Sequence, residues 1–69
     1  MVWCVANKEG TIFLTFDEND EPQLTKKYVE SCAFDSPCEA KEWANKPIQA
    51  FNQSLIEPKC SDRLYAQLR

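Results

Sequence analysis

The chain has 69 residues, a net charge of −3, no histidine and a single glycine. Its 43% hydrophobic and 28% charged residues are typical of a globular protein, and the length predicts one small domain over residues 1–69. The lone glycine excludes glycine-lined phosphate loops, and the lack of a basic stripe argues against direct nucleic-acid binding. Because the sequence shows neither a signal-peptide pattern nor a membrane-spanning apolar run, we expect no membrane partner and a cytoplasmic location.

Residues 2–16 predict a β-hairpin. The loop Asn7–Gly10 fits a type I turn that ends in a left-handed glycine, which pairs Ala6 with Ile12. In this register one face of the hairpin is entirely apolar, and we expect it to face the core. Its members are Val2, Cys4, Ala6, Ile12, Leu14 and Phe16. The other face is too aromatic for plain solvent exposure, so a helix or a partner should cover it. Its members are Trp3, Val5, Thr11, Phe13 and Thr15.

The segment DENDE, residues 17–21, predicts a polar turn, which we call the acidic connector. Its four acidic residues are Asp17, Glu18, Asp20 and Glu21. The longer stretch DENDEPQLTKKY begins like an EF-hand calcium loop, but Pro22 and Tyr28 stand where that loop needs glycine and glutamate. We therefore expect no cofactor there. The functional interpretation is an acidic patch offered to a basic protein surface, or one that imitates DNA phosphates.

The second half of the chain predicts helices. Ser36, Pro37 and Glu39 form a helix start, with Ala40, Trp43 and Ala44 on one face and Pro47 ending the helix near Asn45. We expect Trp43 to pack this helix onto the sheet. A second helix should carry Ile48, Phe51 and Leu55, and a third should begin at Ser61 and carry Leu64, Tyr65 and Leu68.

Residues 23–34 are ambiguous, and we expect a brief helical turn followed by a short strand at 31–34. The predicted fold class is therefore α+β. Its N-terminal antiparallel hairpin or three-stranded sheet should have two to three short helices packed on one face.

Four cysteines, Cys4, Cys32, Cys38 and Cys60, are spaced too widely for the close ligand pairs of a structural zinc site. Without histidine, Ser-His and Cys-His nucleophilic pairs are excluded, and we expect no enzymatic activity. The thiols should be reduced and mostly buried. Because a core of this size supplies only about 3–5 kcal/mol, a disulfide- or zinc-stabilised structural module remains the alternative.

The stretches TIFLTFDEND and FDSPCEAKEW resemble small accessory proteins of bacteriophages. These open with a hairpin that runs into an LTFD-type sequence, followed by the helix start F-D-[ST]-x-x-E-A-x-x-W. The resemblance covers roughly residues 2–45. It implies a protein that binds and inhibits or redirects a host protein, and it assigns no site residue.

The functional hypothesis is a non-enzymatic binding protein that occupies a surface of another protein, as an inhibitor or modulator. A host-directed or anti-defence factor, or a DNA mimic, is the concrete form. The acidic connector should steer encounter with a basic surface, and Trp3 and Phe13 should supply the buried anchor. A homodimer formed through the second hairpin face or its exposed edge is a further alternative.

Overall fold

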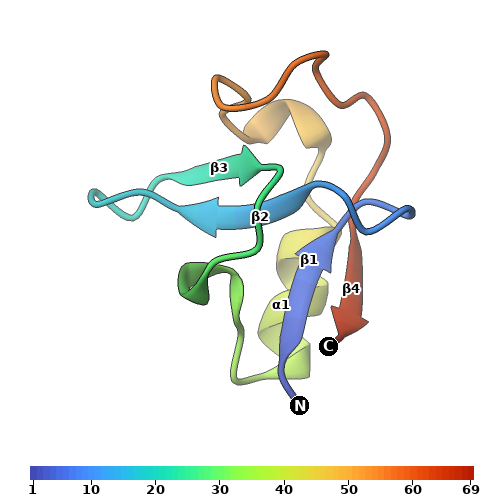
Figure 1. Cartoon of the computed structure of the whole chain (residues 1–69). Coiled ribbons are helices and arrows are strands. Elements are labelled where there is room, and N and C mark those ends of the chain that lie inside the picture. Colours follow the sequence, from blue (N-terminus) through green and yellow to red (C-terminus); the bar gives the residue numbers. More distant parts are fainter.

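A sheet of four short antiparallel strands forms the centre of the fold in the computed structural model, which describes all residues from 1 to 69 (Figure 1). The strands are β1 (Trp3–Ala6), β2 (Phe13–Phe16), β3 (Pro22–Thr25) and β4 (Tyr65–Leu68), in the spatial order β3-β2-β1-β4. The other elements are one α-helix, α1 (Pro37–Ala44), and two 3-10 turns, η1 (Glu30–Cys32) and η2 (Ile48–Ala50).

The sheet bends sharply between β2 and β1. Strand β1 pairs with β4, and β2 pairs with β3, along their full lengths. By contrast, β1 and β2 are in register only where Ala6 lies opposite Phe13. In Figure 1 the β2–β3 ribbon consequently runs across the β1–β4 ribbon. The bend lets other parts of the chain cover both faces of the sheet.

The first hairpin exists as predicted, but its register is shifted by one residue. Gly10 has the expected left-handed φ of 72°, and its N–H bonds to the carbonyl of Asn7. The Asn7 side chain Oδ1 also accepts the N–H groups of Thr11 and Ile12, at 2.8 and 3.0 Å. The loop therefore takes in one more residue than predicted, and Ala6 lies opposite Phe13 instead of Ile12.

This slip exchanges the faces of β1, because strand side chains alternate with a period of two. Val5 joins Leu14 and Leu24 in the larger core, whereas Cys4 and Ala6 join Phe13 in a smaller one. The prediction of a single core face shared by both strands is therefore wrong for β1.

The larger core lies between the sheet and α1. Ala40 and Ala44 are buried on the inner face of the helix, and Trp43 meets Phe16 edge-to-face at a centroid distance of 5.1 Å. The helix thus packs onto the sheet through the residues predicted from its spacing. Its predicted start is also confirmed, because Ser36 Oγ accepts the N–H of Glu39 at 3.4 Å.

The smaller core lies on the opposite face of the sheet. It contains Cys4, Ala6, Phe13 and Cys32, with Tyr28 packed edge-to-face on Phe13 at 5.5 Å. The segment that includes η1 brings Tyr28 and Cys32 onto this face. The predicted aromatic face is therefore divided between the two sides of the sheet. Phe13 is covered by the segment that includes η1, whereas Trp3 and Val5 lie on the side of the larger core.

Two predicted helices are wrong. The second is only the 3-10 turn η2, because Asn52 just beyond it exchanges backbone hydrogen bonds with Leu24 and Pro22 and so is held extended beside β3. Ile48 is still buried, but Leu55 is 56% exposed. The third predicted helix is the strand β4, since pairing with β1 overrides the local helical pattern.

The ambiguous segment 23–34 is resolved into three pieces. Its first residues belong to β3, a strand that the sequence analysis missed. A 3-10 turn then covers Glu30–Cys32, and Phe34 forms an isolated bridge with Trp3. The fold is α+β as predicted, with more strands and fewer helices than expected.

Candidate functional site

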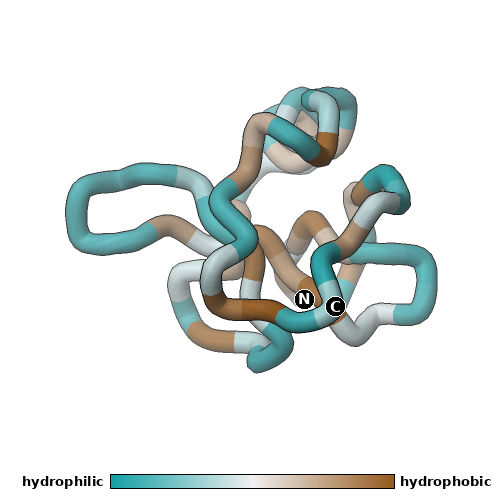
Figure 2. Tube along the Cα trace, turned by 90° about the horizontal axis from the view of Figure 1, so that it is seen from above, coloured by the Kyte–Doolittle hydropathy of each residue, from teal (hydrophilic) through white to brown (hydrophobic).

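The acidic connector forms the tip of the β2–β3 hairpin and projects from one side of the molecule. Figures 1 and 2 show it as a hydrophilic loop at the left, away from β4. Asp17 Oδ1 accepts the N–H groups of Asn19 and Glu21, both at 2.9 Å, and Asp20 is left-handed with φ of 61°. Asp17 therefore shapes the turn. The exposed carboxylates of Glu18, Asp20 and Glu21 face solvent.

The predicted aromatic anchor is not assembled on the surface. Phe13 is only 5% exposed and packs on Tyr28, with the Arg69 guanidinium 5.3 Å from its ring centre. Trp3 is half-buried beside the larger core, and Lys41 Nζ lies 5.9 Å from its ring centre. The structure thus places Phe13 and Trp3 in different cores, and neither joins the acidic connector in one patch.

The outer edge of β4 is open. Val2 and Arg69 lie opposite each other and exchange two backbone hydrogen bonds, of 3.0 and 2.7 Å. This pair determines which residues of β4 bond to β1 and which point away from it. In an antiparallel pair the next hydrogen-bonded residue of β4 is therefore Gln67, and the backbone groups of Ala66 and Leu68 point outward. No backbone or side-chain group beyond the strands bonds to Ala66 or Leu68. Leu68 is also 50% exposed.

The other edge of the sheet is covered. Leu24 donates its N–H to the carbonyl of Asn52 at 2.8 Å, and Asn52 donates to the carbonyl of Pro22 at 3.1 Å. The loop after η2 therefore occupies the outer edge of β3. No such segment covers β4, so its outer edge is the open edge of the sheet.

A groove runs along the open edge, between β4 and the C-terminal half of α1. Its volume is about 300 Å³, and its lining consists of Lys41, Ala44, Asn45, Arg63, Tyr65 and Ala66. We call it the α1–β4 groove. A second hollow of about 380 Å³ adjoins it, sharing Ala44, Asn45 and Arg63 and adding Lys46. Neither lining includes an acidic residue, so this surface is locally basic on a protein of net negative charge.

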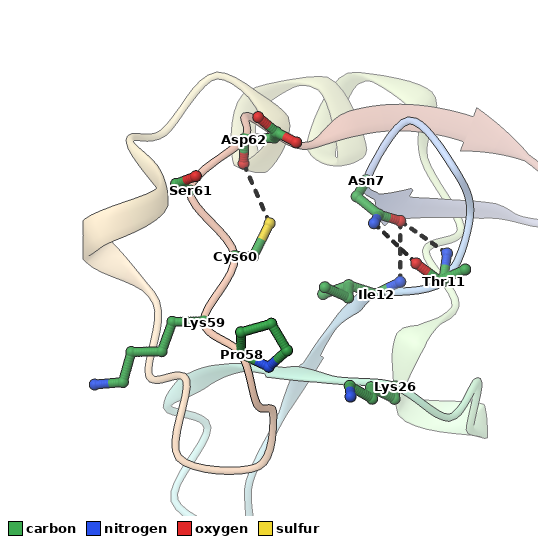
Figure 3. Close-up of a pocket in the computed structure, with 9 residues that line it drawn as sticks. All are labelled: Asn7, Thr11, Ile12, Lys26, Pro58, Lys59, Cys60, Ser61 and Asp62. Carbon is green, nitrogen blue, oxygen red and sulfur yellow. Dashed lines mark hydrogen bonds between the residues drawn. The ribbon is translucent and has the colours of Figure 1, made fainter.

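The largest cavity, of about 400 Å³, lies between the first hairpin loop and residues 58–62 (Figure 3). Its polar groups are largely engaged within the chain. Asn7 bonds to Thr11 and Ile12, Lys26 Nζ donates to the carbonyl of Glu57 at 2.6 Å, and Cys60 Sγ donates to the carbonyl of Asp62.

The four cysteines are unbridged and occupy three kinds of environment. Cys4 and Cys32 are buried in the smaller core, Cys60 is half-buried, and Cys38 is exposed in the first turn of α1. Burial raises the pKa of the Cys4 thiol; the nearby Arg69 opposes the rise and Cys32 adds to it. No three cysteine, aspartate or glutamate side chains lie together so that they could hold a metal ion.

Comparison with protein-family models, with curated proteins and with solved structures finds no significant match for this chain. The bacteriophage resemblance of the hairpin and helix start therefore stays a prediction. None of the helices is long and apolar enough to cross a membrane.

The sequence analysis missed the β4 edge and the α1–β4 groove. One signal was present, because Leu64, Ala66 and Leu68 alternate with the period of a strand. Leu64 and Leu68 also fit a helical pattern together with Tyr65, which is why the sequence predicts a helix there. The cations of the groove are far apart in sequence, so their proximity depends on the tertiary fold.

Proposed function

We propose that the protein is a non-enzymatic binding protein that occupies a surface of another protein and thereby inhibits or modulates it. The observation that carries the proposal is the open edge of β4. There the unpaired N–H and C=O groups of Ala66 and Leu68 offer a template for one more strand. Addition of a partner segment to an exposed edge is a common mode of protein recognition.

The acidic connector has a separate role in this proposal. Its exposed carboxylates raise the rate of encounter with a partner whose surface is basic, as the sequence analysis expected, and they need not lie in the final interface. A host protein is the partner that the bacteriophage resemblance implies. Phe13 is left out of the proposed interface because it is buried, and Trp3 contributes at most its exposed rim.

The experiment compares the parent protein with Ala66→Pro in selection from a display library of random peptides. Proline at position 66 removes an outward N–H but no hydrogen bond to β1, so thermal unfolding should change little. We expect the parent to select peptides that the variant fails to bind. Selected peptides that bind both proteins equally, or no selected peptide at all, would contradict binding through the β4 edge.

The steering role is tested with the double variant Glu18→Lys/Glu21→Lys, which leaves Asp17 in place because Asp17 shapes the turn. We expect slower association of a selected peptide that is rich in lysine and arginine, with little change in its dissociation rate. Lys8→Glu in the other hairpin loop is the control for a charge change at an exposed site. An unchanged association rate at low salt would rule out steering by the acidic connector.

A further inference from the structure

We infer that the α1–β4 groove binds an extended acidic segment, which joins the sheet beside β4 with its carboxylates facing Lys41 and Arg63. The inference rests on the proposed function and adds the chemical class of the bound segment. It uses two independent features: the unpaired backbone of the strand edge, and the sign of the charge in the adjoining groove.

The backbone determines that the segment is extended. Ala66 and Leu68 present their N–H and C=O groups two residues apart, about 7 Å along the strand. Only another strand offers acceptors and donors at the same spacing. A helix has already satisfied its backbone groups internally, so it does not match this edge.

The groove receives every second side chain of the added strand. Ala66 lies opposite Val5, whose side chain is in the larger core beneath α1, so the side chain of Ala66 is on the α1 side of the sheet. Side chains directly opposite each other in neighbouring strands share a face. The residue that pairs with Ala66 therefore points toward the α1–β4 groove, and its neighbours two positions away do the same.

Two cations lie near the two ends of this path. Lys41 Nζ is 5.9 Å from the ring centre of Trp3, which pairs with Leu68, so the lysine is near the end of β4. The guanidinium of Arg63 lies 5.1 Å from the ring of Tyr65, at the start of β4, and donates to Asn45 Oδ1 at 3.3 Å. Acidic side chains at alternate positions of an added strand would meet both cations.

A second copy of the chain is a poorer occupant than an acidic segment. Two β4 strands paired antiparallel would bring the Arg63 and Lys41 side chains of both copies into one region, since both cations flank the same edge. Like charges across an interface are unfavourable. An acidic segment, by contrast, complements the groove, which has no carboxylate in its lining.

The test uses three capped peptides in which threonine alternates with glutamate, glutamine or lysine. Threonine favours the extended form in all three, so the peptides differ only in charge. We expect the glutamate peptide to bind about tenfold more tightly than the glutamine peptide, since two exposed ion pairs are worth about that much, and the lysine peptide to bind least. The amides of Ala66 and Leu68 should show the largest NMR shifts and slower hydrogen exchange.

Three variants locate the effect. Lys41→Glu/Arg63→Glu should reverse the order of the glutamate and lysine peptides, and Ala66→Pro should weaken all three. Lys59→Glu is the matched control, because this exposed lysine lies outside the α1–β4 groove and the order should be unchanged.

Three outcomes would overturn the inference. If all three peptides bind equally and Ala66→Pro abolishes that binding, strand addition stands and the acidic preference fails. If none of the three peptides binds while the random library yields binders sensitive to Ala66→Pro, the inference of an acidic segment is wrong. The proposed binding through the β4 edge is then still supported. If sedimentation shows a dimer that Ala66→Pro dissociates, the occupant of the edge is a second copy.

Discussion

Val5 and Ala66 lie directly opposite each other in β1 and β4, at a position where antiparallel strands do not exchange hydrogen bonds. The backbone of Ala66 therefore points away from β1, toward the open edge. Its side chain lies on the α1 side, where Val5 is completely buried. One residue thus contributes its side chain to the core side of the sheet and its backbone to the open edge, which is why Ala66→Pro changes the edge without removing a hydrogen bond to β1.

Truncation of the larger core should strongly destabilise the fold. Leu14 and Leu24 pair across β2 and β3, and both are fully buried. We expect Leu14→Ala to lower the free energy of unfolding by about 2–5 kcal/mol, because it removes buried apolar contacts and leaves a cavity. Leu55→Ala is the matched control, since Leu55 is 56% exposed and should change stability by about 0.5 kcal/mol or less. Chemical denaturation measures both values, and equal losses would contradict the described packing.

The first hairpin loop should need glycine at position 10 because of its backbone conformation, and not because a larger side chain would clash there. Gly10 has φ of 72°, and a Cβ built there would meet nothing within 4 Å. We expect Gly10→Ala to cost about 1–2 kcal/mol of stability, which is the penalty of a left-handed alanine. Gly10→Asn should cost less, because asparagine tolerates this region better. An equal loss in thermal and chemical unfolding for the two variants would argue against the left-handed conformation.

The acidic connector should be held by Asp17 and not by its other carboxylates. Asp17 Oδ1 accepts two backbone N–H groups at 2.9 Å, whereas Glu18 makes no such bond. We expect Asp17→Ala to lower stability by about 1 kcal/mol and to speed hydrogen exchange of the Asn19 and Glu21 amides. Glu18→Ala should leave both quantities nearly unchanged. Equal exchange rates in the two variants would show that the turn does not need Asp17.

Thiol labelling of the native protein should follow exposure. We expect Cys38 to react first, at the rate of an unstructured thiol, and Cys60 to react more slowly. Cys4 and Cys32 should react only when the protein unfolds, because both are buried in the smaller core. Mass spectrometry of partly labelled protein measures the order, and denatured protein, in which all four react, is the control. Early labelling of Cys4 would contradict this packing.

The stability of the domain should decrease in alkali partly through Cys4. Burial raises the pKa of this thiol above its ordinary value of 9.0, so the folded state keeps a proton that the unfolded state releases. The contribution is complete below pH 9.0 and is lost as the pH rises through the folded pKa. We expect the decrease in unfolding free energy between neutral and alkaline pH to be smaller in Cys4→Ala. Parallel pH profiles would contradict the raised pKa.

The sequence alone was sufficient where the deciding residues are neighbours in the chain. Ser36, Pro37 and Glu39 begin a helix by local hydrogen bonding and a fixed proline φ, and α1 starts there. Gly10 supplies a left-handed turn, and the acidic connector with Pro22 forms a hairpin tip. The exposure of three connector carboxylates also follows from their place in a polar turn. Each of these features depends on interactions within a few residues.

The tertiary structure decided the register, the last strand and the groove. The side chain of Asn7 lengthened the first loop by one residue. Val5 therefore lies in the larger core, where Cys4 was expected, and Cys4 lies in the smaller core on the other face of the sheet. Residues 64–68 fit either a helix or a strand by pattern, and only the unsatisfied edge of β1 made them β4. The α1–β4 groove has both Lys41 and Arg63 in its lining, although they are 22 positions apart in sequence. Strand pairing and the burial of α1 bring these distant segments of the chain together.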